Sequence, residues 1–475
     1  MATDFTPHAY QKRAAKFIVR RKRCMLALSP GLGKTSSTLL AEAVLRKHGH
    51  VRKTLVIAPL RPAQMVWAQE ARKWKQFEHL KITLLHGPKK AERLREEADI
   101  YVVNVEGLQW LIKEAGDTCP FDMIVLDEST LLKSPSSKRA KALRPWARQV
   151  EYFVELTGTP TPHSLEDLFG QIYLLDGGES LGKYITHFRS RYFRPVSQRG
   201  HVVYKWGLLP GADELIYERI SHLCLRMSAE EYLDLPDILY HDVTVRLTSK
   251  VMKQYKSLER EMFAELDEGL TGESATQLLA MSAASARQQC HQFTGGAVYH
   301  EEDKSQWHVV HDEKEKALVE LLESLQGAPV LVAIQFRHEL PRVKAAIKKV
   351  TGIDPPAIVG GQKLDLDQLQ GDWNCGRHPA LIVHPASLSH GANLQGAGIG
   401  VIWYSLSDNF EHYEQLNRRL HRQGRKEPVH IWHLIAENTV DKAIRAASAE
   451  GGEKDSQQSR LLSALLKYRD SVLSI

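Results

Sequence analysis

A glycine-rich stretch at 29–35, SPGLGKT, carries the residue types that bind a triphosphate. Gly31 and Gly33 let the backbone approach phosphate oxygens, and a helix that begins after them turns its N–H groups toward the same anion. Lys34 is then placed to bridge the β- and γ-phosphates, and Thr35 to ligate a magnesium ion. The plainer alternative is a glycine turn with a solvated lysine. The hydrophobic run before the stretch and the helix-like run after it favour a loop that binds ATP and Mg²⁺.

Two adjacent carboxylates, Asp127 and Glu128, end a second hydrophobic run, MIVLDE at 123–128. Asp127 is suited to hold the magnesium ion, and Glu128 to polarise the attacking water. Buried strands often end in an acidic cap, so the pair alone is weak evidence. Its place after the glycine-rich stretch, at the sheet edge where ligands bind, makes it more specific. One residue departs from the phosphate-loop pattern, because Leu28 stands where that pattern has Gly or Ala.

A cluster of arginines lies in EQLNRRLHRQGR at 414–425. Its members are Arg418, Arg419, Arg422 and Arg425. If the segment is helical, Arg419 and Arg422 share one face, as guanidinium donors aimed at a phosphate would. An exposed basic helix is the alternative. In the functional interpretation, these two residues are arginine fingers supplied by a second domain.

Short apolar runs alternate with longer amphipathic ones from residue 7 to about 175, which is typical of strands and crossover helices around a parallel sheet. The expected strands lie at 24–28, 54–59, 82–85, 100–104, 123–127 and 152–158. A second pattern of the same kind begins near residue 314. We therefore predict an α/β protein with two tandem parallel-sheet lobes. Between them we expect a mostly helical insert with one extended segment at 242–247.

The expected boundaries follow these changes of pattern. An N-terminal ATP-binding lobe covers residues 1–175, and the helical insert covers residues 176–310. A C-terminal lobe with the arginine fingers covers residues 311–450, and a tail helix covers residues 451–475. Within the insert, HFRSRYFRP at 187–195 interleaves arginines with aromatic residues, which could suit nucleic acid. Packing of the aromatic residues onto a lobe is the better interpretation.

The composition points to a packed protein with a mild preference for anions. Hydrophobic residues make up 43% and charged residues 25% of the chain, as in ordinary globular proteins. A net charge of +6 and a pI near 8.8 favour an anionic partner only weakly. The five cysteines never form a CxxC pair, so we expect neither a disulfide framework nor structural zinc. Without an apolar run of membrane-spanning length or a signal peptide, we expect a cytoplasmic protein with no membrane partner.

With these motifs in order, the chain resembles the Swi/Snf-type ATPases of helicase superfamily two over most of its length. PHAYQKRAAKFI at 7–18 is similar to the entry segment of that family, SPGLGKT to motif I, and VIAPLRPAQMVWAQEARKW to the motif that follows. FDMIVLDESTLLKSPSSKRAKAL resembles the Walker B stretch, and LTGTPTPHSLEDLFGQIYLL resembles motif III. The second half contains VLVAIQF, SLSHGANLQGAGIGVIWYSL and QLNRRLHRQGR, which are similar to motifs IV, V and VI.

The resemblance implies two RecA-like lobes that close on ATP, with Arg419 and Arg422 completing the site from the second lobe. It further implies that Gln11 recognises adenine. Thr157 and Thr159 in LTGTP would relay the nucleotide state to the nucleic-acid side.

By the same resemblance, the expected partner is double-stranded DNA, and a preference for plain or branched duplex is left open. Loops around Arg61, Asn104 and Ser389 would contact mostly phosphates, and Gln415 would join the coupling residues. The implied activity is that of a DNA-dependent ATPase, a translocase that does not separate strands. A strand-separating helicase and a nucleotide-gated DNA-binding scaffold with little hydrolysis are the alternatives. A nuclease or recombination factor is a candidate further partner.

Two departures from the family stand out. The family usually has His and Ala-type residues after the acidic pair, whereas Ser129 and Thr130 follow it here. We therefore expect the link between hydrolysis and movement to use different hydrogen bonds. The chain also shows no obvious accessory reader domain and is similar to the small bacterial and phage members. The expected compartment is accordingly the cytoplasm of a bacterial host or of a phage-infected cell.

Overall fold

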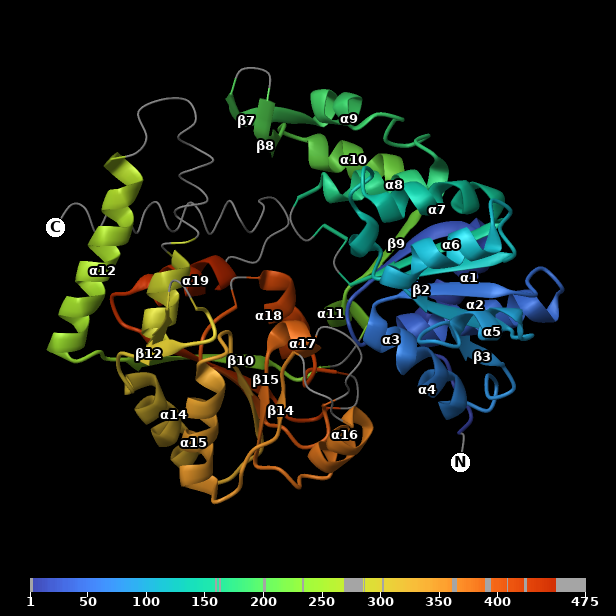
Figure 1. Ribbon diagram of the computed structural model, residues 1–475. Coiled ribbons are helices and arrows are strands. Elements are labelled where there is room, and N and C mark those ends of the chain that lie inside the picture. Colours follow the sequence, from blue (N-terminus) through green and yellow to red (C-terminus); the bar gives the residue numbers. More distant parts are fainter. Residues whose placement is uncertain are drawn as a thin grey trace. The chain divides into compact units, whose positions relative to one another are not determined.

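Figure 1 shows the computed structural model, in which the chain divides into two compact units. The first unit comprises Met1–Val196 and Trp206–Asp234, and the second comprises Ser197–Lys205 and Leu235–Ile475. The structure describes residues 3–158, 160–161, 164–199, 202–232, 235–268, 285, 287–300, 303–360, 365–388, 394–407, 409–422 and 425–449. Each unit is built on a parallel sheet of its own, which confirms the predicted fold class.

The sheet of the first unit has seven strands in the order β3-β4-β2-β5-β6-β1-β9, and every neighbouring pair is parallel. The strands are β1 (Arg23–Leu28), β2 (Thr54–Ala58), β3 (Ile82–Leu84), β4 (Ile100–Asn104), β5 (Met123–Asp127), β6 (Tyr152–Thr157) and β9 (Cys224–Met227). All but β9 lie where the sequence predicts a strand. Because the strands are parallel, the carboxyl ends of β1, β5 and β6 meet at one edge.

The strand β9 was absent from the sequence prediction, which placed a single extended segment between residues 176 and 310. As an edge strand, β9 buries Leu225 and Met227 but exposes Arg226, so it lacks the continuous apolar run of the central strands. Other strands in this region form two small two-stranded sheets. These are β7 (Phe193–Arg199) with β8 (Val202–Leu208), and β11 (Ala297–Tyr299) with β12 (Trp307–Val309).

Alternate residues of the first sheet enter two hydrophobic layers. Leu126 and Phe153 belong to one layer, and Val125 and Val154 to the other. The first layer is covered by α6 (Leu108–Ala115), α7 (Lys138–Gln149), α8 (Asp167–Asp176), α9 (Ile185–Tyr192) and α10 (Ala212–Ile220). The second is covered by α1 (Ala9–Arg21), α2 (Lys34–Lys47), α3 (Leu60–Gln64) and α4 (Val66–Lys73). The short helices α5 (Lys90–Arg95) and α11 (Ala229–Tyr232) also belong to this unit.

The aromatic residues of the segment 187–195 pack inward. Phe188, Tyr192 and Phe193 are buried in the first hydrophobic layer. Arg189 Nε pairs with Glu166 Oε1 at 2.6 Å, and its guanidinium lies 5.4 Å from the ring centre of Trp206. The packing interpretation of this segment is confirmed.

The second unit contains a six-stranded parallel sheet in the order β10-β17-β16-β13-β15-β14. Its strands are β10 (Ile238–Val245), β13 (Val330–Ala333), β14 (Ala357–Ile358), β15 (Ala380–Val383), β16 (Gly400–Trp403) and β17 (Val429–Ala436). One hydrophobic layer involves α14 (Glu313–Ser324) and α15 (Glu339–Thr351). The other involves α12 (Ser249–Glu268), α16 (Leu366–Asn374), α17 (Pro385–Leu388), α18 (Phe410–Asn417) and α19 (Val440–Ala449). The predicted tail helix at 451–475 lies outside the described residues.

Candidate ATP-binding site

The glycine-rich stretch joins β1 to α2 at the carboxyl edge of the first sheet. Gly33 precedes α2 in the left-handed conformation with a φ of 67°, and Gly31 has a φ of 93°. A Cβ added at Gly33 would lie 2.5 Å from Gln11 Nε2 and 2.8 Å from Ser36 Oγ. The left-handed backbone favours glycine here, and any larger residue would also displace the Gln11 and Ser36 side chains. The loop runs directly into a helix N-terminus, which is the geometry that phosphate binding needs.

Neighbouring strands hold the start of this loop. Ser29 N donates to Met227 O of β9 at 3.1 Å, and Lys34 Nζ donates to Leu28 O at 2.9 Å. The Leu28 side chain is fully buried in the second hydrophobic layer. The side chain of Leu28, the residue that departs from the phosphate-loop pattern, therefore packs in the hydrophobic core. The Leu28 carbonyl oxygen accepts the hydrogen bond from Lys34 in the loop. Thr35 is half-buried in the first turn of α2.

Asp127 ends β5 and is buried. Burial raises the pKa of Asp127, while a hydrogen bond from Trp67 and the charge of Lys34 act in the opposite direction. The Trp67 bond runs from Nε1 to Asp127 Oδ2 at 3.0 Å. The sequence reasoning missed Trp67 as a site residue, because the segment it belongs to also contains Trp74. The structure separates the two, since Trp74 Nε1 donates to Glu70 Oε1 at 2.8 Å instead.

Glu128 has an unusual backbone. Its φ of 59° and ψ of 68° are left-handed, and the residue leads into a short 3₁₀ turn, η2 (Ser129–Leu132). A side chain other than glycine costs on the order of 1–2 kcal/mol in this conformation. Strain of this kind at a candidate catalytic carboxylate is typical of functional sites.

The segment after β6 lies against the phosphate loop. Thr157 is buried at the end of β6 and pairs with Ala27 of β1. A Cβ added at the next residue, Gly158, would lie 3.4 Å from the Pro30 ring and 3.7 Å from Lys34 Nζ. Thr159, the second predicted coupling residue, lies outside the described residues.

Gln11 belongs to α1 and is buried beside the loop. Its Oε1 accepts a hydrogen bond from His8 N at 2.9 Å, and its Nε2 lies next to Gly33. The first unit therefore brings Gln11, Gly33 and Lys34 together with Asp127 and Glu128. The adenine contact of Gln11 stays a prediction.

The predicted arginine fingers belong to the second unit, and their local structure differs from the expectation. The helix α18 ends at Asn417, so Arg419 lies in the turn that follows and Arg422 in the irregular segment after it, and the two do not share a helical face. Arg418 Nε pairs with Glu414 Oε2 at 2.9 Å, and Arg422 Nε donates to Arg418 O at 3.1 Å. Desolvation lowers the pKa of Arg422 to about 10, so the side chain stays cationic at neutral pH.

The other polar residues of the segment 414–425 each make different contacts. Arg419 is buried, and Gln415 is half-buried on α18. Arg425 Nη1 donates to Gly398 O at 2.7 Å, which gives Arg425 a structural contact. His421 Nε2 bonds to the carbonyl oxygen of Pro236, at 2.7 Å, and so ties this turn to the segment before β10.

The residues predicted to contact nucleic acid lie at strand ends. Arg61 is in α3, directly after the carboxyl end of β2, and Asn104 ends β4. Asn104 is buried, and its Nδ2 donates to Glu106 Oε2 at 2.8 Å. Ser389 lies outside the described residues. The DNA contacts of all three stay predictions.

A cavity of about 1050 Å³ opens at the carboxyl edge of the second sheet. Loops that follow β13, β14 and β15 line it, with Arg337 after β13, Gly360 after β14, and His384 and Ser387 after β15. The sequence before Arg337 is similar to motif IV, but the sequence pattern did not identify Arg337 as a site residue. Its position in the cavity wall makes Arg337 a candidate phosphate contact.

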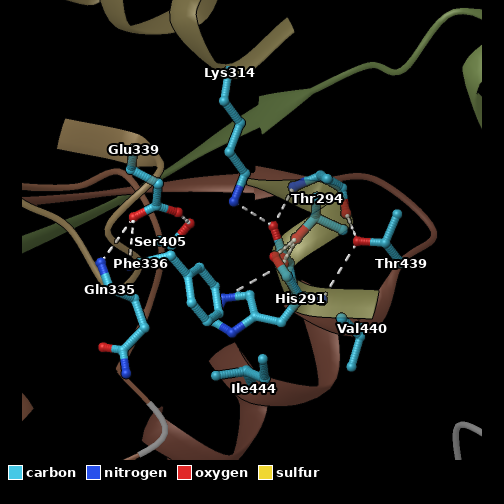
Figure 2. Close-up of polar contacts among 12 residues, drawn as sticks. His291, Thr294, Lys314, Gln335, Phe336, Glu339, Ser405, Thr439, Val440 and Ile444 are labelled. Atoms are coloured by element: carbon cyan, nitrogen blue, oxygen red, sulfur yellow. Dashed lines mark hydrogen bonds and ion pairs between the residues drawn. The ribbon is translucent and has the colours of Figure 1, made fainter. Parts of the chain in front are cut away.

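The loop after β13, which lines this cavity, is ordered by a buried carboxylate whose contacts are drawn in Figure 2. Glu339 Oε2 accepts hydrogen bonds from Gln335 N at 2.8 Å and Phe336 N at 3.1 Å. Glu339 Oε1 accepts another from Ser405 Oγ at 2.6 Å. A separate buried ion pair, Lys314 Nζ to Asp441 Oδ2 at 2.7 Å, lies nearby in the same unit. These bonds fix the loop after β13 without using a side chain of the cavity wall.

Within the described ranges, no three His, Cys, Asp or Glu side chains gather in a way that could hold a metal ion. In the same part of the chain, no helix combines the length and apolar character needed to cross a membrane.

Comparison with known proteins gives matches over most of the chain. A model of the SNF2-related domain matches residues 10–294. The protein p41 of Acyrthosiphon pisum secondary endosymbiont phage 1 is 34% identical over 455 residues, which cover 93% of this chain and 95% of p41. YqhH of Bacillus subtilis, named an uncharacterized ATP-dependent helicase, is 23% identical over 93% of this chain and 77% of YqhH. Among solved structures, the Sulfolobus solfataricus SWI2/SNF2 ATPase core in complex with dsDNA covers 98% of this chain and 95% of that core, with 21% identity and a TM-score of 0.46.

Proposed function

This chain belongs to the SNF2-related family, and from that membership we propose that it is an ATP-driven motor that moves along double-stranded DNA. The observation that carries the proposal is the group of side chains at the carboxyl edge of the first sheet. There the loop with Gly31 and Gly33 meets Lys34, the buried Asp127 and the left-handed Glu128. A family model alone would allow a member that has lost hydrolysis, and the phosphate loop with its nearby acidic pair supports a member that has kept it.

The donor atoms in this group fit a magnesium ion bound with ATP. Thr35 offers a hydroxyl and Asp127 a carboxylate oxygen, which are the hard ligands that magnesium takes. When bound with ATP, the ion would neutralise phosphate charge. Trp67 holds one oxygen of Asp127, which orients the carboxylate before the ion arrives. Lys34 contributes a cation for the phosphates, and Glu128 orients the attacking water.

Arg419 and Arg422 would complete the reaction from the second unit. Arginines supplied across an interface stabilise the charge of the transferring phosphoryl group and typically contribute about 10³–10⁵ in rate. The lowered pKa of Arg422 supports this assignment, because a cation that burial disfavours gains energy when a phosphate reaches it. Hydrolysis would then depend on closure of the two units, and DNA that binds both would favour closure.

Contacts with DNA should be mostly with phosphates. The cavity at the edge of the second sheet supports this, since it offers Arg337 beside backbone and small polar side chains. On the first unit, the loops that contain Arg61 and Asn104 are the proposed counterparts. Affinity should fall steeply with salt, because each phosphate contact releases counterions.

The test is an ATPase assay with single-stranded, duplex and branched DNA, combined with displacement of a triplex-forming strand. Duplex DNA should stimulate hydrolysis. The Glu128→Gln substitution should lower the stimulated rate by at least about 100-fold, while ATP still binds. The third strand should be displaced in an ATP-dependent manner.

The same assays separate the two alternatives. Unwinding of a forked duplex without triplex displacement would identify a strand-separating helicase and refute the translocase. An absence of DNA-stimulated hydrolysis, with DNA binding that still responds to ATP, would identify a nucleotide-gated scaffold.

A further inference from the structure

A buried side-chain link joins the turn after the acidic pair to the segment after β6. Ser129 Oγ donates to Gln171 Oε1 at 2.6 Å, and both side chains are fully buried. Gln171 Nε2 donates in turn to the carbonyl oxygens of Pro160 and Asp167, at 2.8 Å each. Because the amide nitrogen faces two carbonyl oxygens, the amide oxygen is left for Ser129. One glutamine of α8 thus bonds to both segments.

The helix α8 also packs tightly against the end of the same turn. A Cβ added at Gly170 would lie only 2.0 Å from Lys133 O, so only glycine permits this approach. Lys133 Nζ pairs with Asp167 Oδ2 at 3.3 Å. A displacement of α8 must therefore displace the turn that follows Glu128.

The surroundings of Ser129 make the link strong. Glu155 of β6 is fully buried beside Ser129, and burial raises the pKa of Glu155 well above its ordinary value, although the charge of Arg23 lowers it. Burial thus favours a neutral carboxyl next to the hydroxyl. Hydrogen bonds in such low-dielectric surroundings are strengthened, and a polar atom that loses its partner there is not rescued by water.

The position of Ser129 in the chain decides what the link can do. Ser129 directly follows Glu128, whose left-handed backbone conformation is unfavourable for a residue with a side chain. Fixing the Ser129 side chain therefore fixes the peptide that orients the Glu128 carboxylate. An alanine at this position would lack the hydroxyl that makes this connection.

We propose that Ser129 and Gln171 are positioning residues that transmit movement of Pro160, after β6, to Glu128, so that duplex DNA stimulates hydrolysis through α8. The inference rests on the proposed function, since it concerns the same acidic pair. In this scheme, DNA shifts the segment after β6. Gln171 moves with the Pro160 carbonyl, to which it is hydrogen-bonded. Ser129 follows, and the Glu128 carboxylate reaches the position from which it orients water.

The test measures kcat and the KM for ATP with and without duplex DNA for Ser129→Ala, Gln171→Met and the double variant. Each single variant should lose about tenfold in the ratio of DNA-stimulated to basal rate, as expected for one buried hydrogen bond, with little change in KM. The double variant should lose no more than either single one, because both break the same connection. Gln171→Glu should behave like Gln171→Met, because it retains the acceptor for Ser129 but loses the donor to Pro160.

Gln149→Met is the matched control. Gln149 of α7 also accepts from a backbone N–H, that of Cys119, and donates to a backbone carbonyl, that of Asp117, but it does not contact the turn or α8 through these bonds. Its stimulation ratio should equal that of the wild type. The inference is overturned if Ser129→Ala lowers thermal stability but keeps the full ratio, or if the losses of the two single variants add. A wild-type protein that DNA does not stimulate at all would instead refute the proposed function.

Discussion

Burial raises the pKa of Asp127, the candidate magnesium ligand, and a hydrogen bond from Trp67 opposes this shift. Trp67→Phe removes the donor and leaves the burial that raises the pKa of Asp127. The carboxyl should then hold its proton to higher pH, and the acidic limb of the pH profile of kcat/KM should move toward higher pH. At neutral pH we expect a loss of about tenfold in kcat/KM, the usual effect of one hydrogen bond to a charged group.

The neighbouring tryptophan is the control for that prediction. Trp74→Phe removes an equivalent bond, to Glu70, outside the site. Its pH profile should match the wild type. Equal profiles for the two variants would show that the Trp67 bond does not act on Asp127.

A buried histidine predicts acid sensitivity in the second unit. Burial lowers the pKa of His338 from 6.5 to about 3, and neither ring nitrogen has a hydrogen-bond partner among the described residues. Because the folded pKa lies below the unfolded one, the unfolded chain binds more protons, and stability falls as the pH drops below about 6.5. At pH 5 this residue alone should cost up to about 2 kcal/mol.

His338→Phe should remove that acid penalty. The ring already stacks on Phe336 and contacts Tyr299 edge to face, so phenylalanine suits the site. Hydrogen exchange of the α15 amides at pH 5 and pH 8 measures the effect. The variant should gain protection relative to the wild type at pH 5 only, and an equal gain at both values would contradict the assignment.

At the scale of elements, two helical glycines that look alike in the sequence should respond in opposite ways. Gly170→Ala forces α8 away from Lys133 O and should cost about 2–3 kcal/mol of unfolding free energy, as overpacking does. Gly371→Ala, in α16, meets nothing within 4 Å and should stabilise by up to about 1 kcal/mol. Thermal unfolding of both variants checks the pair. Equal effects of the two substitutions on stability would show that the packing of α8 can accommodate the added methyl group.

The elements that could be predicted are those whose residues face only the core. Strands such as β5 are buried along their whole length and therefore read as continuous apolar runs. β9 could not be read in this way, because one of its faces is exposed. The end of α18 at Asn417 was hidden for another reason. Contacts distant in sequence, such as the bond between His421 and the Pro236 carbonyl, shape the following turn, and no glycine or proline marks it before Gly424.

The residues of the candidate site likewise include some that the sequence predicts and some that it does not. Gly31, Gly33 and Lys34 could be recognised because backbone approach and charge demand those residue types at that spacing. Trp67 and Gln171 could not, because each acts through a partner that only the folded chain supplies.

For the molecule as a whole, the proposed motor requires a cation from each unit. Arg422→Lys should reduce DNA-stimulated kcat by about 10³-fold or more while ATP binding changes little, because an ammonium cannot reproduce the fork of donors. Arg418→Lys is the comparison, since Arg418 already pairs with Glu414. Single-turnover hydrolysis and nucleotide-binding titrations separate the two steps. Equal losses for both variants would remove Arg422 from the reaction.

The edge position of β9 also has a consequence for the order in which the protein is made. β1 carries the phosphate loop, yet its outer neighbour β9 ends only at Met227, whose carbonyl also receives Ser29 N. A ribosome must therefore release about fifty residues beyond Asp176, the end of α8, before this edge of the sheet is complete. Until then β1, which is paired with β6 on one side, presents an open outer edge beside the phosphate loop, and this edge can pair with chaperones or other chains.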